Sequence, residues 1–314
     1  MSKDLISVII PVFNEQNHIS NSIDIIRTEL LKINIQFEFI IVDDGSRDNT
    51  WSILKELSKD INDIYAIKLS RNFGKEAALC SGLEIARGNA CLVMDADLQH
   101  PPKLIHHMIE KWKYEGYDVV EAVKSHRGKE SFVNKVGASI FYTLLERLSG
   151  FKLYGASDYK LLDRKVVDAW KELPERDTFF RGMSAWVGFN RASLSFEVAS
   201  RTEGKSKWSI LHLVKLAVTA ITSFSTLPLQ IVTFMGTLFL IGSFILGIQT
   251  LFMKFSGIAV TGFTTVILLL LIIGSTLMIS LGIIGTYIAR IYNEVKARPR
   301  YVIKETIESK KNDL

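Results

Sequence analysis

The chain has 314 residues, which is enough for one α/β domain of ordinary size and an additional part. Its apolar fraction is 48%, and this excess is concentrated in the C-terminal third, so the composition argues against a purely soluble protein. The net charge of +5 is compatible with nucleic acid, an anionic membrane surface or phosphorylated ligands, and the apolar segments favour the last two. Cys80 and Cys91 form no CxxC pair or zinc-spaced cluster, so we expect two reduced thiols in the core.

The N-terminus leads directly into a short apolar run, Ile6–Val12. Pro11 and Asn14 interrupt it, and the run is too short for the apolar core of a signal peptide. We therefore expect the first domain to lie in the cytosol.

Short apolar runs then alternate with amphipathic stretches. Strands are expected at Ile6–Val12, Phe37–Val42, Ile64–Leu69, Ala90–Met94, Asp118–Val123 and, further along, Ala192–Val198. Helices are expected at His18–Ile33, Thr50–Lys59 with Asp48 as N-cap, Lys75–Ala86, Pro101–Tyr114, Val166–Trp170 and Phe179–Val187. This alternation predicts an α/β fold with a mostly parallel sheet covered on both faces, whose ligands bind beyond the carboxyl ends of the strands.

Two long segments without charge follow, Leu227–Met253 and Phe255–Ala289. Each is long enough to cross a hydrocarbon core of about 30 Å. Basic residues flank the pair on both sides, at Lys205, Lys207, Lys215, Arg290, Lys296, Arg298 and Arg300. The positive-inside rule therefore predicts two transmembrane helices with both chain ends in the cytosol. The stretch Trp208–Phe224 suits either an amphipathic helix at the interface or an ordinary domain helix.

Polar residues follow each of the first four expected strands. These loops are Pro11–Glu15, Asp43–Ser46, Ser70–Lys75 and Asp95–Gln99. Because the carboxyl ends of parallel strands meet at one edge of a sheet, one ligand can touch all four loops. Each motif alone is typical of a turn or helix cap, so the prediction rests on their joint placement.

A nucleotide-sugar has chemistry that matches these loops. Carboxylates such as Asp43 and Asp44 can accept hydrogen bonds from an imide or from ribose hydroxyls. Asp95 and Asp97 form an Asp-x-Asp turn whose oxygens suit Mg²⁺ or Mn²⁺. Such a cation would stabilise the charge that grows on a departing diphosphate.

Several motifs together resemble glycosyltransferase family 2, and within it the polyprenyl-phosphate glycosyltransferases similar to dolichyl-phosphate mannose synthase. They are SVIIPVFNE at Ser7–Glu15, IIVDDGSRDNT at Ile40–Thr50, LSRNFGKEAAL at Leu69–Leu79, VMDADLQHPP at Val93–Pro102, DYKLLDR at Asp158–Arg164, RTEGKSKWS at Arg201–Ser209 and YIARIYNEVKARPRYV at Tyr287–Val302. The resemblance covers nearly the whole chain. It implies a GT-A fold and inverting transfer from a UDP-sugar to undecaprenyl phosphate at the cytoplasmic face of the inner membrane, by a homo-oligomer.

The resemblance also implies a domain order. It comprises a cytosolic catalytic domain at 1–204, juxtamembrane amphipathic helices at 205–226, two transmembrane helices at 227–290 and a cytosolic tail at 291–314.

Roles for individual residues follow from the same resemblance. Donor contacts are implied for Pro11, Glu15, Asp43, Asp44, Lys75, Asp95 and Gln99, with Asp95 and Asp97 holding the metal. Contacts to the acceptor or to a phosphate are implied for Lys124, Arg127, Lys129, Arg201 and Lys205. Asp158 occupies the place of the family's catalytic base. A phosphate monoester is largely dianionic at neutral pH, however, so we expect Asp158 to position a sugar hydroxyl or a basic residue instead.

Two other functions are compatible with parts of this pattern. A processive polysaccharide synthase would have a similar first domain, but it would carry a Gln-x-x-Arg-Trp motif that this chain lacks. A membrane protein that binds nucleotide-sugar without turnover would not need the Asp-x-Asp turn together with Asp158. The sequence does not distinguish glucose, N-acetylglucosamine, galactose and an aminoarabinose derivative as the transferred sugar.

Overall fold

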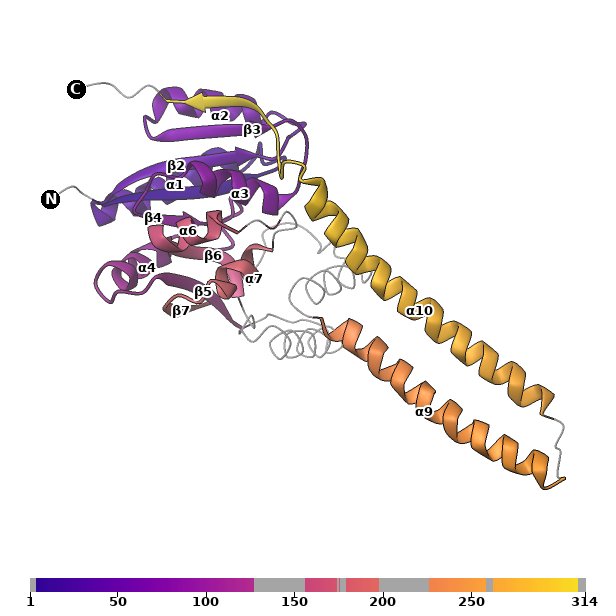
Figure 1. Cartoon of the computed structure of the whole chain (residues 1–314). Helices are drawn as coiled ribbons and strands as arrows, with labels where there is room; N and C mark the ends of the chain where they lie inside the picture. Colours follow the sequence, from indigo (N-terminus) through magenta and orange to yellow (C-terminus); the bar gives the residue numbers. More distant parts are fainter. Residues whose placement is uncertain are drawn as a thin grey trace. The chain divides into compact units, whose positions relative to one another are not determined.

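The computed structural model describes residues 4–126, 156–173, 175, 179–197, 226–257 and 262–309. The chain forms two compact units, one of Met1–Trp208 with Arg298–Leu314 and the other of Ser209–Ala297. The first unit is an α/β domain, and the described part of the second consists of two long helices (Figure 1).

The described residues of the first unit contain an eight-stranded sheet with the order β7-β5-β6-β4-β1-β2-β3-β8 (Figure 1). Its strands are β1 Leu5–Val12, β2 Gln36–Asp43, β3 Ile64–Leu69, β4 Ala90–Val93, β5 Val119–His126, β6 Ala156–Asp163, β7 Arg191–Glu197 and β8 Ile303–Glu308. Strands β4, β1, β2 and β3 are neighbours and run parallel, as do β5 and β7, whereas β6 and β8 run antiparallel to their partners. The predicted mostly parallel sheet is confirmed.

Helices pack on both faces of this sheet. They are α1 Ile19–Ile33, α2 Thr50–Asp60, α3 Lys75–Ile85, α4 Leu104–Lys113, α6 Arg164–Lys171 and α7 Phe180–Trp186. Helices α1, α2 and α4 share one core with alternate residues of β1 and β2. Helix α3 packs on the opposite face, where Gly82 allows close approach because a Cβ there would lie 2.6 Å from Ile9 Cγ2. Cys80 and Cys91 are both buried, and neither forms a disulfide, as expected.

Strand β6 brings the middle of the chain to the loop edge of the parallel strands. It pairs antiparallel with β4, with Ala90 opposite Asp163 and Val93 opposite Lys160. Continuing this register by two residues places Asp158 opposite Asp95, just beyond the carboxyl end of β4. Because β6 runs antiparallel to β4, the first residues of β6 lie at the same edge of the sheet as the loops that follow the parallel strands.

The end of the chain adds a strand to the sheet. Within the segment 291–314, which was expected to be a cytosolic tail, helix α10 extends to Lys296 and Ile303–Glu308 forms β8 beside β3. Trp51 Nε1 donates to Glu305 at 2.9 Å, which ties β8 to α2. From Arg298 onward the described residues belong to the first unit, where the backbone of β8 forms an edge of the sheet.

The second unit contains the helices α9 Leu227–Phe255 and α10 Phe263–Lys296. Leu227–Phe255 and Leu269–Lys296 are long and apolar enough to cross a membrane, and the most apolar window of each has no residue buried within the protein. This pattern is expected of helices whose apolar side chains face lipid. The juxtamembrane helices expected at 205–226 lie, except for Thr226, outside the described residues.

One helix start differs from the expectation. Asp48 was predicted as the N-cap of α2, but Asn49 occupies that position and makes no side-chain cap bond. Asp48 Oδ1 instead accepts from the backbone N–H and the hydroxyl of Thr50, at 3.0 and 2.6 Å. A carboxylate one residue before the N-cap can therefore still accept a hydrogen bond from a backbone N–H of the first helical turn that has no partner within the helix.

Candidate active site

The four predicted loops meet at the carboxyl edge of β1, β2, β3 and β4. The first loop is tied to the second because Asn14 N–H donates to Ser46 Oγ and Arg47 N–H donates to Asn14 Oδ1, both at 2.9 Å. Glu15 N–H donates to Thr50 Oγ1 at 2.9 Å, at the start of α2. Pro11 is partly exposed near the end of β1. Burial raises the pKa of the Glu15 carboxyl, and the nearby Asp97 adds to this effect against the opposing influence of His18.

Asp44 connects the second loop to the third. Its carboxylate accepts the backbone N–H groups of Phe73 and Gly74 at 2.7 and 2.9 Å. Gly45, with φ of 70°, lies so near the third loop that a Cβ would be 2.5 Å from the carbonyl carbon of Arg71. Burial raises the pKa of Asp44, although the two amides oppose this shift. Asp44 thus fixes the loop that leads into α3.

Asp43 is held inside the edge of the sheet. Its side chain is fully buried, Oδ1 accepts from Ser46 N–H at 2.8 Å, and Oδ2 lies 3.6 Å from Lys68 Nζ. This geometry gives Asp43 a role in shaping the second loop, which the sequence did not predict. The expected contacts of Asp43 and Asp44 with a nucleoside remain predictions.

Asp95 and Asp97 lie in the turn after β4. Asp97 Oδ1 accepts from Gln99 N–H at 3.1 Å, and Asp95 Oδ1 lies 2.5 Å from Lys75 Nζ. No group of three or more potential metal ligands occurs among the residues that the structure describes. Mg²⁺ is commonly held by one or two carboxylates together with substrate phosphates, so this donor set fits a cation that arrives with a diphosphate.

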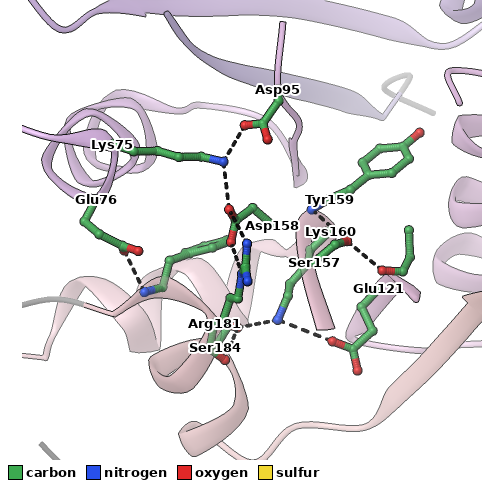
Figure 2. A network of polar contacts seen from close by, with 12 residues as sticks. Lys75, Glu76, Asp95, Glu121, Ser157, Asp158, Tyr159, Lys160, Arg181 and Ser184 are labelled. Carbon is green, nitrogen blue, oxygen red and sulfur yellow. Dashed lines mark hydrogen bonds and ion pairs between the residues drawn. The ribbon is translucent and has the colours of Figure 1, made fainter. Parts of the chain in front are cut away.

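Asp158 is the centre of a charged cluster formed by three elements (Figure 2). Arg181 on α7 donates Nε to Oδ1 at 2.6 Å and Nη2 to Oδ2 at 3.0 Å. Lys75, the first residue of α3, donates to Oδ2 at 2.7 Å and at the same time contacts Asp95. The cluster therefore consists of two carboxylates bridged by one ammonium, with a guanidinium on the second carboxylate.

The cluster keeps Asp158 ionised. Burial alone would raise the pKa of Asp158, but the charges and hydrogen bonds of Arg181 and Lys75 outweigh it and hold the pKa well below its usual range. Burial would likewise lower the pKa of Lys75, but Asp95 and Asp158 raise it. A carboxylate with so low a pKa is a weak proton acceptor, whereas it positions cations well.

A second layer of buried polar groups lies behind the cluster (Figure 2). Lys160 on β6 is fully buried, and its ammonium donates to Ser184 Oγ on α7 at 2.8 Å. Glu121 on β5 lies 3.3 Å from Lys160 and accepts from Arg191 Nη2 at 2.9 Å. Burial lowers the pKa of Lys160 to about 8, although Glu121 opposes this shift. The hydrogen bond from Lys160 to Ser184 attaches α7 to the sheet, while the ion pairs of Glu121 join β5 to β6 and β7.

The sequence patterns predicted no role for Arg181, Glu76, Lys160, Ser184 or Glu121. Arg181 had one detectable signal, because it is a single charge within the apolar helical stretch FFRGMSAW at Phe179–Trp186. Four predicted site residues lie outside the described residues, namely Arg127, Lys129, Arg201 and Lys205.

Comparison with known proteins identifies the family. Residues 7–169 match the family described as glycosyl transferase family 2. An uncharacterized glycosyltransferase of Synechocystis is 38% identical over 96% of this chain and 95% of that protein. The bactoprenol glucosyl transferase of Shigella phage SfII is 37% identical over 96% of this chain and 98% of that protein.

A solved structure is similar over part of the chain. Glucosyl-3-phosphoglycerate synthase from Mycobacterium tuberculosis, in complex with uridine-diphosphate, is 19% identical with a TM-score of 0.49, over 70% of this chain and 80% of that chain. The family match covers the four loops and Asp158, and the relatives match over nearly their whole length. The chain therefore belongs to glycosyltransferase family 2 and is a glycosyltransferase.

Proposed function

We propose that the chain transfers a sugar from a UDP-sugar to a polyprenyl phosphate, with inversion at the anomeric carbon. The observation that carries this proposal is the cluster of Lys75, Asp95, Asp158 and Arg181 at the loop edge, where cations suited to phosphates are held by carboxylates. The acceptor class is supported by a full-length relative named for transfer of glucose to bactoprenol.

The proposed reaction is one in-line displacement. An oxygen of the lipid phosphate forms a bond to the anomeric carbon as the bond from that carbon to the diphosphate breaks, and UDP leaves with the bonding electrons. A phosphate monoester has a second pKa of about 6, so its attacking oxygen is already deprotonated at neutral pH. The low pKa of Asp158 suits this chemistry, because the site then needs a group that positions cations rather than a base.

We assign the parts of the donor to different loops. The nucleoside would contact Pro11, Glu15 and Asp44, and the buried Asp43 would hold the second loop in place. Asp95 and Asp97 would hold Mg²⁺ or Mn²⁺, which when bound neutralises charge on the diphosphate, with Gln99 beside them. Lys75 and Arg181 place positive charge where the phosphates of donor and acceptor meet.

A membrane setting suits a lipid acceptor whose reactive head stays at the interface. Two crossings by α9 and α10 return the chain to the side from which it left. The pairing of β8 with β3 supports the same proposal, because strands of one sheet lie on one side of a membrane. Basic residues near both ends of the pair favour the cytosolic side. A homo-oligomer remains a prediction from the family resemblance.

The topology leads to a prediction for a reporter fused to Leu314. We expect the reporter to be cytosolic, on the same side as one fused to the N-terminus. A fusion at residues 258–261, between α9 and α10, is the matched control and should report the outside. An external reporter at Leu314 would contradict both the two-crossing topology and the placement of β8.

The activity itself is tested with a panel of donors. Membranes containing the protein are incubated with undecaprenyl phosphate and one of several UDP-sugars, and lipid products are identified by mass spectrometry. We expect one donor to give a lipid whose mass equals undecaprenyl phosphate plus the sugar residue, and membranes with the Asp158→Asn variant to lack it. A lipid product equally abundant in membranes without the protein would contradict the proposal.

A further inference from the structure

Helix α7 carries Arg181 but has only seven residues, Phe180–Trp186. A helix of this length is not stable in isolation, so tertiary contacts must determine where its side chains point. Its C-terminal half is attached to the sheet, because Ser184 Oγ accepts from Lys160 and Ser184 O accepts from Arg191 Nη1 at 3.1 Å. The direction of Arg181, near the other end, requires a second attachment.

Glu76 supplies this attachment. Its Oε2 accepts the backbone N–H of Phe180, the first residue of α7, at 2.7 Å (Figure 2). The N-cap residue of α7, Phe179, has no side-chain acceptor with which to cap the helix, so a carboxylate from another helix satisfies one of the orphan amides of the first turn.

Glu76 and Lys75 are adjacent in the first turn of α3, and they contact two parts of the same cluster. Lys75 donates to Asp158, while Glu76 holds the amide beside Arg181, which itself holds Asp158 through two hydrogen bonds. The contacts close a ring from α3 to α7, from α7 to β6 and from β6 back to α3. Moving any one member changes the alignment of the other two.

We propose that Glu76 is a positioning residue for the transfer, which fixes the first turn of α7 and thereby aims Arg181 at Asp158. This inference rests on the proposed function. Without the Glu76 acceptor, the Phe180 amide loses its partner and the first turn loosens. Asp158 then keeps Lys75 but loses the planar, bidentate partner that sets its orientation.

A double-mutant cycle tests whether Glu76 acts through Arg181. In the full-length protein, we expect Glu76→Ala to lower kcat about tenfold and Arg181→Ala to lower it about a hundredfold, since small misplacements at a reacting centre are costly. The double variant should be no slower than Arg181→Ala alone, because the two residues form one chain of contacts. Glu76→Gln keeps an amide oxygen for Phe180 N–H and should retain kcat within about threefold.

Asp163→Ala is the matched control. Asp163 is the N-cap of α6 and accepts from Lys165 N–H at 3.0 Å, at the far end of β6 from Asp158. Its loss should lower thermal stability, and any effect on kcat should multiply with that of Arg181→Ala. If the effects of Glu76→Ala and Arg181→Ala also multiply, or if Glu76→Gln is as slow as Glu76→Ala, the inference is wrong.

Hydrogen exchange measured by mass spectrometry gives an answer that does not require turnover. Glu76→Ala should raise amide exchange in peptides covering α7 about tenfold or more, while Glu76→Gln and Asp163→Ala should leave it unchanged. Unchanged exchange in Glu76→Ala would overturn the positioning role, whichever substrate the enzyme uses. A wild-type protein that forms no lipid-linked sugar, yet shows this exchange pattern, would contradict the proposed function and leave the role of Glu76 supported.

Discussion

Replacing Asp158 by asparagine is expected to lower turnover at least a hundredfold, and by the same factor at every pH from 5 to 8. We expect the same factor at each pH for two reasons. The pKa of Asp158 lies well below its usual range, so the carboxylate stays ionised from pH 5 to 8, and its contribution to folding stability is lost only at lower pH. The variant loses the acceptor of Arg181 and Lys75, and this loss of geometry does not titrate between pH 5 and 8.

The measurement is the ratio of variant to wild-type turnover at saturating lipid and UDP-sugar. If Asp158 were a base that deprotonates the acceptor, the variant would recover as the lipid phosphate ionises by itself, with a ratio rising about tenfold per pH unit below a phosphate pKa of about 6. Asp168→Asn is the control, since the Asp168 side chain forms an exposed ion pair with Arg164 at 3.4 Å and its replacement should leave turnover unchanged. Equal thermal stability of the two variants would exclude unfolding as the cause.

The second large effect is expected for Asp97→Asn, which should lower turnover by about a hundred- to a thousandfold. A neutral amide is a poorer ligand than a carboxylate for a hard cation such as Mg²⁺. Asp97 is exposed at the loop edge and its one described hydrogen bond comes from the local Gln99 amide, so the substitution should leave the fold intact.

Binding of UDP to the Asp97→Asn variant separates a loss of metal from a loss of structure. Wild-type affinity for UDP should fall when a chelator removes divalent ions, whereas the variant should bind weakly with or without chelator. Asp60→Asn, an exposed carboxylate at the end of α2, should behave as wild type. Near wild-type turnover in Asp97→Asn would show that the metal assignment is wrong.

Local sequence patterns predicted the sheet well because its strands are short, β-branched runs between clear turn signals. The expected strand Ile64–Leu69 matches β3 in both bounds, and the four polar loops lie at one edge because the parallel strands that precede them are neighbours. No strand was predicted at β6 or at β8. The edge strand β8 has the sequence IKETIE, whose charges resemble those of a solvated tail.

The Asp158 cluster was only partly predictable from sequence. Lys75 and Asp158 were both identified, and Asp158 was expected to position a sugar hydroxyl or a basic residue, but nothing in the sequence paired them. Their contact depends on the antiparallel register of β6 against β4, which is a tertiary property. The roles of Arg181 and Glu76 depend on how α7 packs, and a seven-residue helix leaves little periodic signal.

The linkage in the lipid product tests the central claim most directly. Purified protein is incubated with undecaprenyl phosphate and a UDP-sugar labelled with ¹³C at its α-configured anomeric carbon, and the product is examined by ¹³C and ³¹P NMR. A single displacement by the lipid phosphate predicts one new phosphodiester, with coupling between the labelled carbon and phosphorus and with the β configuration. An α-linked product, or free sugar as the only labelled product, would contradict this account.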